Sequence, residues 1–446
     1  MNFPVLILAC LLAHPCKATP VQADASAKAE ANSIKRYMFS KNTFPEVQAE
    51  LVKRKILFAT APQAPATGRT TGATGIGASG YATPYLIDQV GGRFHVYAER
   101  RRPQHPVAPL PYLTQEVVFE TPNSDVAPVG TLSYPKSGGP FPAVVLVAGS
   151  GVHDRDAGMS LHKTLLVLAD HLTRQGFAVL RYDKRGVGLT GGELHPGSTT
   201  DDYAADALAA TQFLKMQPNI SPDQIGIIGH SEGGIIAAMV AAQSPKDVRF
   251  IVMLGGTGLP GIDVKVLQDA AARRADGMSE PLVLSYQSFE RKLFQIAASK
   301  LSRTDALAAM REATSSLTAE TKTALEIPPT GLPDEAFEQL LTPWFRRFFS
   351  LDPRLYLNRV NCPVLALVGD KDLQVPPVEN LKEIKKALKR AAPLTTMRML
   401  PDLNHNFQTA KTGKASEYFL IEETVAPSAL ALMHTWIKSV VHTRSP

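Results

Sequence analysis

The chain has 446 residues, of which 44% are hydrophobic and 20% are charged, and this balance excludes a largely disordered chain and a multi-span membrane protein. The length fits one large domain with additional segments. The net charge is +6, but Lys and Arg are interleaved with Asp and Glu and form no basic stripe with aromatic residues, so we expect no nucleic-acid partner.

The chain begins with an apolar run, residues 3–13, followed by small residues typical of a signal-peptide cleavage site. The run is too short to cross a bilayer, so we expect no stable membrane span. Residues 1–25 therefore predict a signal peptide and export to the periplasm or medium, with a buried N-terminal helix as the alternative. Cleavage there would remove Cys10 and Cys16, and Cys362 would have no partner for an intramolecular disulfide.

Residues 26–110 precede the main domain and change composition part-way. Residues 26–58 are rich in Ala, Lys, Glu, Val and Leu and predict a helical segment. Residues 59–84 are dominated by Ala, Thr, Gly and Pro, which indicates a linker or a mobile loop. A short strand is expected at residues 92–99, and a proline-rich stretch then leads into the main domain.

The main domain, residues 111–446, shows strands alternating with helices. This alternation predicts an α/β fold with a mostly parallel eight-stranded sheet and helices on both faces. The first two strands are separated by a polar turn and are expected to pair antiparallel. The predicted strands are 116–121, 129–134, 143–148, 178–182, 224–229, 250–254, 364–369 and 395–400, and the predicted helices are 161–175, 200–216, 232–243, 378–390 and 428–441.

The alternation is interrupted once, by helical segments at residues 264–274, 281–299, 304–313 and 334–349. An insertion at about residues 259–355 fits a helical cap over a site at the end of the sheet, and a separate partner-binding module is the alternative. Trp344 and Phe345 are candidates for an apolar wall of a substrate pocket. Internal packing is the alternative for this aromatic run.

The segment Gly229-His230-Ser231-Glu232-Gly233 lies between a predicted buried strand and an apolar helix. Glycines two positions before and after Ser231 permit the sharp strand-to-helix turn that exposes a nucleophilic serine. Such a serine needs a neighbouring base and donors aimed at the developing oxyanion. One donor is the backbone N–H of Glu232, and the second is expected from Ser150 or Gly151 in the loop after the third strand.

The acid that supports such a serine is expected after it in the chain, on the loop that follows residues 364–369. That loop carries two carboxylates, Asp370 and Asp372. We favour Asp372 because it projects further beyond the end of the strand, whereas Asp370 is better placed to brace the turn. Asp370 remains the alternative.

The base is expected after the acid, where the chain has only His405, His434 and His442. His405 alone lies between a predicted strand and a predicted helix, since the other two lie in the terminal helix and the tail. We therefore predict that His405 takes the proton of Ser231 and that Asp372 orients the imidazole.

No metal or cofactor is predicted, because the chain lacks H-E-x-x-H, paired C-x-x-C and a dinucleotide-type Gly-rich loop in a strand-to-helix setting. Two charged clusters, residues 154–156 and 181–188, follow predicted strands. Their charges could steer a substrate, but ion pairs that brace the loops are the favoured interpretation.

Five segments in this order resemble those of bacterial secreted carboxylesterases related to dipeptidyl aminopeptidases and acylaminoacyl peptidases. The resemblance extends over about residues 103–441, and its segments are 149–156, 182–186, 229–234, 369–372 and 403–405. It implies an α/β-hydrolase fold with a cap and a triad of Ser231, Asp372 and His405. Many members have His-Gly before the oxyanion residue, where this chain has Ala148-Gly149.

The resemblance implies hydrolysis of short-chain acyl esters through an acyl-enzyme, with a small acyl ester as the partner. A serine aminopeptidase or acylaminoacyl peptidase is the first alternative, because the same triad serves both reactions. We favour the ester because no pair of glutamates near aromatic residues follows residue 258 to bind a substrate ammonium, apart from Glu422-Glu423 before the last helix. A non-catalytic binding protein is the second alternative, and no oligomeric state is predicted.

Overall fold

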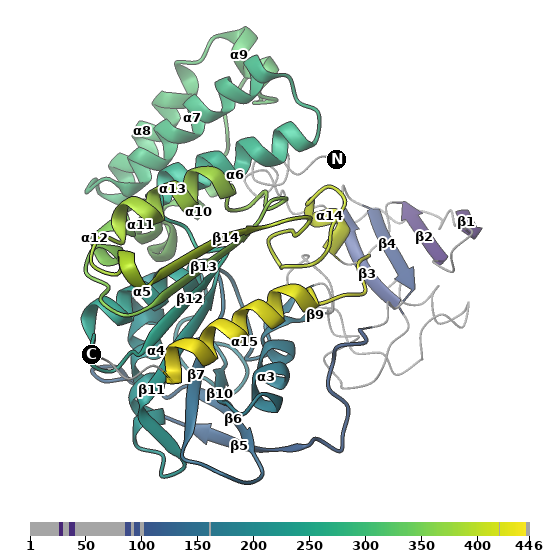
Figure 1. The fold of residues 1–446 in the computed structure, drawn as a ribbon. Helices are drawn as coiled ribbons and strands as arrows, with labels where there is room; N and C mark the ends of the chain where they lie inside the picture. Colours follow the sequence, from purple (N-terminus) through teal and green to yellow (C-terminus); the bar gives the residue numbers. More distant parts are fainter. Residues whose placement is uncertain are drawn as a thin grey trace.

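The fold is that of a computed structural model, which describes residues 26–29, 35–40, 85–90, 93–98, 102–159, 162–418 and 420–442. Its main feature is an eight-stranded sheet in the order β14-β13-β12-β11-β7-β10-β6-β5 (Figure 1). The strands are β5 (Tyr112–Val118), β6 (Val129–Pro135), β7 (Phe141–Val147), β10 (Ala178–Tyr182), β11 (Ile220–His230), β12 (Phe250–Leu254), β13 (Val364–Gly369) and β14 (Thr395–Leu400).

The first two strands of this sheet pair antiparallel, as the sequence predicts. β6 is antiparallel to both β5 and β10, and all other neighbours are parallel. The mostly parallel eight-stranded sheet is therefore confirmed. The first strand was predicted at residues 116–121 and is observed at Tyr112–Val118. It ends early because the chain then turns, with the Thr121 N–H bonded to the carbonyl of Val126. Two short strands, β8 (Gly158–Met159) and β9 (His162–Lys163), form a small sheet that the sequence did not predict.

Helices cover both faces of the sheet (Figure 1). On one face, α3 (Thr164–Arg174) and α15 (Pro427–His442) pack against Val144 and Leu146 of β7. On the other, the alternate residues of β7 pack with α4 (Thr200–Lys215), α5 (Glu232–Gln243) and α13 (Pro377–Ala387). The parallel strands are buried on both faces, because their side chains point alternately into the two helical layers. This explains their continuous apolar sequences.

The insertion between β12 and β13 is helical, and α6 to α9 project beyond one end of the sheet (Figure 1). Its helices are α6 (Gly261–Ala275), α7 (Glu280–Ala298), α8 (Arg303–Ser315), α9 (Ala319–Ala324), α10 (Asp334–Leu340), α11 (Pro343–Ser350) and α12 (Arg354–Leu357). The predicted single helix 334–349 is wrong: α10 ends before Pro343, whose ring has no N–H to donate and which begins α11. Short helices α9 and α12 were not predicted.

The N-terminal strands β1 (Ser26–Ala29), β2 (Lys35–Ser40), β3 (Tyr85–Val90) and β4 (Arg93–Ala98) form an antiparallel sheet in the order β1-β2-β4-β3. β4 confirms the strand expected at residues 92–99. The helical prediction for residues 26–58 is wrong at β1 and β2, because pairing with neighbouring strands satisfies their backbone and Tyr37 and Phe39 favour strands. The predicted signal peptide and residues 59–84 lie outside the described residues.

Within the described part of the chain, no helix combines the length and apolar character needed to cross a membrane.

Candidate active site

Ser231 lies at the tip of the turn between β11 and α5, with a φ of 55° and a ψ of −120°. A non-glycine residue at positive φ is strained, and such strain is typical of functional positions. The turn requires glycine on both sides, since a Cβ at Gly229 would overlap the carbonyl of Gly233 and one at Gly233 would overlap that of Val147. The sharp turn predicted from the pentapeptide is therefore present.

His405 lies beside Asp372 rather than Asp370. The Nδ1 of His405 is 2.8 Å from Oδ2 of Asp372, and both side chains are buried. The other carboxylate oxygen accepts the backbone N–H groups of Gln374 and Val375, both at 2.8 Å. Asp370 is exposed on the same loop. Asp372 is thus held in one orientation by its own loop and is the carboxylate that reaches the histidine.

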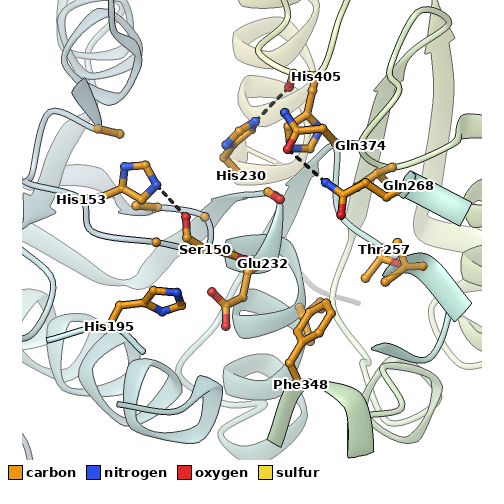
Figure 2. A pocket seen from close by; sticks show the side chains of 18 of the residues that line it. Ser150, His153, His195, His230, Glu232, Thr257, Gln268, Phe348, Gln374 and His405 are labelled. Carbon is orange, nitrogen blue, oxygen red and sulfur yellow. Dashed lines mark hydrogen bonds between the residues drawn. The ribbon is translucent and has the colours of Figure 1, made fainter. Parts of the chain in front are cut away.

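His230 supports His405 from the other side. Its Nε2 is 2.9 Å from the carbonyl oxygen of His405, so this nitrogen carries the proton and donates (Figure 2). Burial, with His405 nearby, lowers the pKa of His230 to about 3, and the ring is neutral at pH 7. No role for His230 could be predicted from the sequence, because its partner lies 175 positions along the chain.

Gly255, directly after β12, packs against the same pair. Its φ is 58°, and a Cβ there would lie 3.1 Å from two atoms of the His405 ring and 3.3 Å from Asp372 Oδ2. The sequence did not single out this glycine. The backbone at Gly255 therefore packs close to the imidazole, where a side chain would crowd the ring.

Ser231 and His405 line one cavity of about 310 Å³, to which helices α6 and α11 of the insertion also contribute side chains. Helix α11 supplies Trp344, Phe345 and Phe348 to its wall, so the two aromatic residues proposed from the sequence do line it. Phe349 instead stacks on Phe294, with ring centroids 4.4 Å apart, inside the cap. The aromatic run therefore divides between lining the cavity and packing the cap.

The residues predicted to bind the oxyanion also reach this cavity: Ser150, Gly151 and Glu232 line it. Glu232 is the first residue of α5, so its N–H has no partner in the preceding turn of helix. The loop of Ser150 approaches the serine closely, since a Cβ on Gly149 would lie 3.0 Å from the Cβ of Ser231. Any larger residue at position 149 would push this loop away from Ser231.

The side chain of Glu232 connects the serine turn to the cap. Its Oε1 accepts hydrogen bonds from the Thr200 hydroxyl and from the Trp344 indole N–H, both at 2.7 Å. Its buried Oε2 makes no hydrogen bond and lies 3.8 Å from the Nζ of Lys184. No sequence pattern predicts these contacts, because Thr200, Glu232, Trp344 and Lys184 lie in four separate segments of the chain.

Two further histidines, His153 and His195, line the same cavity. Burial is the main reason that the pKa of each is lowered to about 4, and the nearby Lys184 ammonium adds to it. The His195 ring meets Trp344 edge-on, with centroids 4.8 Å apart. Both rings are therefore uncharged at neutral pH.

The charged clusters after β7 and β10 form ion pairs with each other. Arg155 pairs with Asp183 at 2.7 Å and also with Glu116, and Arg181 pairs with Asp156. These contacts join the loops at the carboxyl ends of the strands. The interpretation that the clusters brace the loops is confirmed.

In the part of the chain that the structure describes, no group of three or more His, Cys, Asp or Glu side chains could hold a metal ion.

Comparison with known proteins gives partial matches. Residues 158–320, which contain Ser231, match the family model described as serine aminopeptidase, S33. Esterase EstD of Thermotoga maritima is 29% identical over 280 residues, 62% of this chain and 57% of the relative. Two uncharacterised proteins of Mycobacterium tuberculosis are each 33% identical over 132 residues, 29% of this chain and 42% of each relative. The chain thus spans about half the length of the curated relatives it matches.

Similar solved structures include the α/β hydrolase GrgF from a Penicillium species, with 16% identity, a TM-score of 0.47, and coverage of 74% of this chain and 100% of that one. An esterase of Pyrococcus furiosus is also 16% identical, with a TM-score of 0.43 and coverage of 74% and 93%.

Three observations decide the fold class. They are the strand order, the strained serine between β11 and α5, and the His405–Asp372 pair on the loops after β14 and β13. The chain has an α/β-hydrolase fold. The insertion between β12 and β13 forms its cap. The fold implied by the resemblance to carboxylesterases is the fold that the structure has.

Proposed function

We propose that this α/β-hydrolase is a serine carboxylesterase that hydrolyses short-chain acyl esters through Ser231, His405 and Asp372. The observation that carries the proposal is the 2.8 Å hydrogen bond between buried His405 and Asp372, in a protein whose strained Ser231 lines the same cavity as that histidine. The relative named as an esterase supports the reaction type.

In the proposed first step, His405 takes the hydroxyl proton of Ser231 as the serine oxygen attacks the ester carbonyl carbon. Asp372 accepts a hydrogen bond from Nδ1–H of His405, so it fixes the tautomer and stabilises the imidazolium that forms. The backbone N–H groups of Glu232 and Ser150 stabilise the negative charge on the carbonyl oxygen. The imidazolium then protonates the alcohol, which leaves, and Ser231 remains acylated.

In the second step, water replaces the alcohol. His405 removes a proton from water as it attacks the acyl carbon, and the same donors hold the second oxyanion. The imidazolium returns a proton to Ser231, and the acid product leaves. The neighbouring His230 and Gly255 keep the ring of His405 in position through both transfers.

The cavity supports a small substrate. Its volume of about 310 Å³ is near the lower end of known ligand pockets, and Trp344, Phe345 and Phe348 form an apolar wall. We propose that the acyl chain contacts this wall.

An aminopeptidase is the second candidate, favoured by the match of residues 158–320 to a family described as serine aminopeptidase. Binding a substrate ammonium needs an available carboxylate. Among the described residues that line the cavity, Glu232 is the acidic one, and its charge is already opposed by Lys184. This favours the ester.

Export is proposed as well, and it rests on the signal-like sequence of residues 1–25. Fractionation of cells that express the full chain, with mass analysis of the mature N-terminus, tests it.

The test of function combines labelling with a substrate panel. A fluorophosphonate probe is expected to label the wild-type protein and not Ser231→Ala. In a panel of acyl esters of increasing chain length beside aminoacyl and acyl-aminoacyl amides, short-chain esters are expected to turn over fastest. Faster turnover of amides than of matched esters would favour the peptidase, and an unlabelled wild-type protein would leave only a binding role.

A further inference from the structure

Lys184 reaches the loop that carries the predicted oxyanion donor. Its Nζ donates a hydrogen bond of 2.8 Å to the carbonyl oxygen of Gly149. The next carbonyl, that of Ser150, accepts a hydrogen bond of 2.8 Å from Nε2 of His153 (Figure 2). Two consecutive peptide groups of this loop are therefore each held by a side chain.

The hydrogen bond to Gly149 also sets the direction of the Ser150 N–H. In a planar trans peptide the C=O and the following N–H point in opposite directions. Lys184 and Tyr203 line a separate, much smaller cavity, whereas Ser150 and Ser231 line the larger cavity that contains His405. Holding the Gly149 carbonyl towards Lys184 therefore turns the Ser150 N–H towards the side on which Ser231 lies.

Lys184 is itself held firmly. The side chain is buried, and its Nζ lies 3.7 Å from the centroid of the Tyr203 ring and 3.8 Å from Oε2 of Glu232. Burial lowers the pKa of this ammonium group, and the Glu232 carboxylate opposes that effect. A buried lysine is rare unless it is paired, and here its partners are the residue after the nucleophile and the oxyanion loop.

We propose that Lys184 is a positioning residue that holds the Ser150 N–H in the orientation that stabilises the oxyanion. The inference rests on the proposed esterase function and deepens it. It also explains how the loop is held in a chain that has Ala148-Gly149 where similar enzymes have His-Gly. The side chain of Lys184 touches no substrate and acts through the Gly149–Ser150 peptide.

The direct test is Lys184→Met, which keeps most of the side-chain volume and removes the ammonium group. Loss of a true oxyanion donor lowers kcat by about 10²- to 10³-fold, so a misdirected donor is expected to lower it by about 10- to 100-fold. KM for the same ester is expected to change by less than about 3-fold, because the donor acts on the transition state.

An alkyl boronic acid provides a second readout. It forms a tetrahedral adduct with Ser231 whose oxygen occupies the oxyanion position, so Lys184→Met is expected to weaken its inhibition by about the same factor as kcat/KM. A purely structural role would lower the unfolding temperature without this parallel loss of affinity.

Two further variants isolate the effect. Lys184→Met leaves Glu232 as an unpaired buried charge, so Lys184→Met with Glu232→Gln is compared with Glu232→Gln alone. The kcat loss caused by Lys184→Met is expected to persist in the double variant, in which positions 184 and 232 are both uncharged. Arg185→Met is the matched control, since it removes an adjacent buried cation that pairs with Asp206 and not with the oxyanion loop. It is expected to lower stability and to keep boronate affinity.

Three results would overturn the role of Lys184: unchanged kcat in a folded Lys184→Met protein, recovery of kcat in the neutral double variant, or a loss of boronate affinity in Arg185→Met as large as in Lys184→Met. Failure of the proposed function is distinguishable, because it would appear in the wild-type protein itself, which would then bind no fluorophosphonate or would hydrolyse amides faster than matched esters.

Discussion

The two sides of the candidate active site are built in different ways. On the base side, backbone groups hold Asp372, and the His405 carbonyl accepts from His230. On the oxyanion side, the side chains of Lys184 and His153 hold two backbone carbonyls. The Asp372 carboxylate is fixed by the backbone of its own loop, and the oxyanion side by the side chains of buried Lys184 and half-buried His153, so the two should respond differently to substitution and to pH.

The largest expected effect tests the base side. Asp372→Asn should lower kcat for ester hydrolysis by about 10⁴-fold, because the imidazole loses the carboxylate that selects its tautomer. Asp370→Asn is the matched control two residues away, and its exposed side chain should leave kcat close to that of the wild type. Equal losses in the two variants would contradict the assignment of the acid.

A smaller loss is expected from crowding His405. In Gly255→Ala, the new methyl group would lie 3.1 Å from the imidazole ring at a residue with φ of 58°. Since displacement of a catalytic group by about 1 Å can cost 10²-fold, we expect a kcat loss of that order. Gly176→Ala is the control, because Gly176 also has positive φ but no atom lies within 4 Å of its added Cβ. It should lose stability and keep its kcat.

Acid should weaken the oxyanion side through His153. Its pKa in the folded protein is about 4, below the ordinary value near 6.5 that applies in the unfolded chain. Between these values the unfolded state binds more protons, so the free energy of unfolding falls as pH falls from about 6.5 towards 4. From pH 7 to pH 5 this histidine alone should remove about 2 kcal/mol.

Urea unfolding of the wild type and of His153→Gln at pH 7 and pH 5 measures this effect. Glutamine retains an N–H donor and does not titrate, so the variant should lose about 2 kcal/mol less than the wild type over this interval. Parallel losses in the two proteins would show that His153 does not stay neutral in the fold.

The smallest effect concerns the contact between the cap and the serine turn. Trp344→Phe keeps an aromatic wall but removes the hydrogen bond to Glu232, which should lower stability by about 1–3 kcal/mol and kcat/KM by a few-fold. Trp436→Phe removes the other tryptophan, which lies on α15 and donates its indole N–H to the Thr396 hydroxyl on β14. That control should leave kcat/KM unchanged. If both variants lost kcat/KM equally, the hydrogen bond of Trp344 would have no specific role at the site.

The sequence predicted most of the main domain, because continuous apolar runs such as residues 364–369 are typical of strands buried on both faces. It failed where context outside the segment decides. Composition favoured a helix at β2, which pairs with β4 instead, and helical periodicity across residues 334–349 concealed the break before Pro343.

The site shows the same division. Ser231 could be predicted because its glycines, strand and helix are adjacent in the chain. Asp370 and Asp372 could not be separated by pattern, because the choice depends on which carboxylate reaches His405. Lys184 stood in a recognised charged cluster, but its contact with Gly149 depends on how β7 and β10 lie side by side.

The cap leaves the sheet after β12 and returns at β13, and these two strands are direct neighbours, with Met253 opposite Ala366. Because the two strands are parallel, the connection must cross back over the sheet, but its helices can differ in number and length without moving Ser231, Asp372 or His405. Exchange of this insertion is a route by which a common hydrolytic core could acquire new substrate preferences. The indole of Trp344 sets a condition on such a chimera: for full activity, a transplanted cap must again bring a hydrogen-bond donor to Glu232.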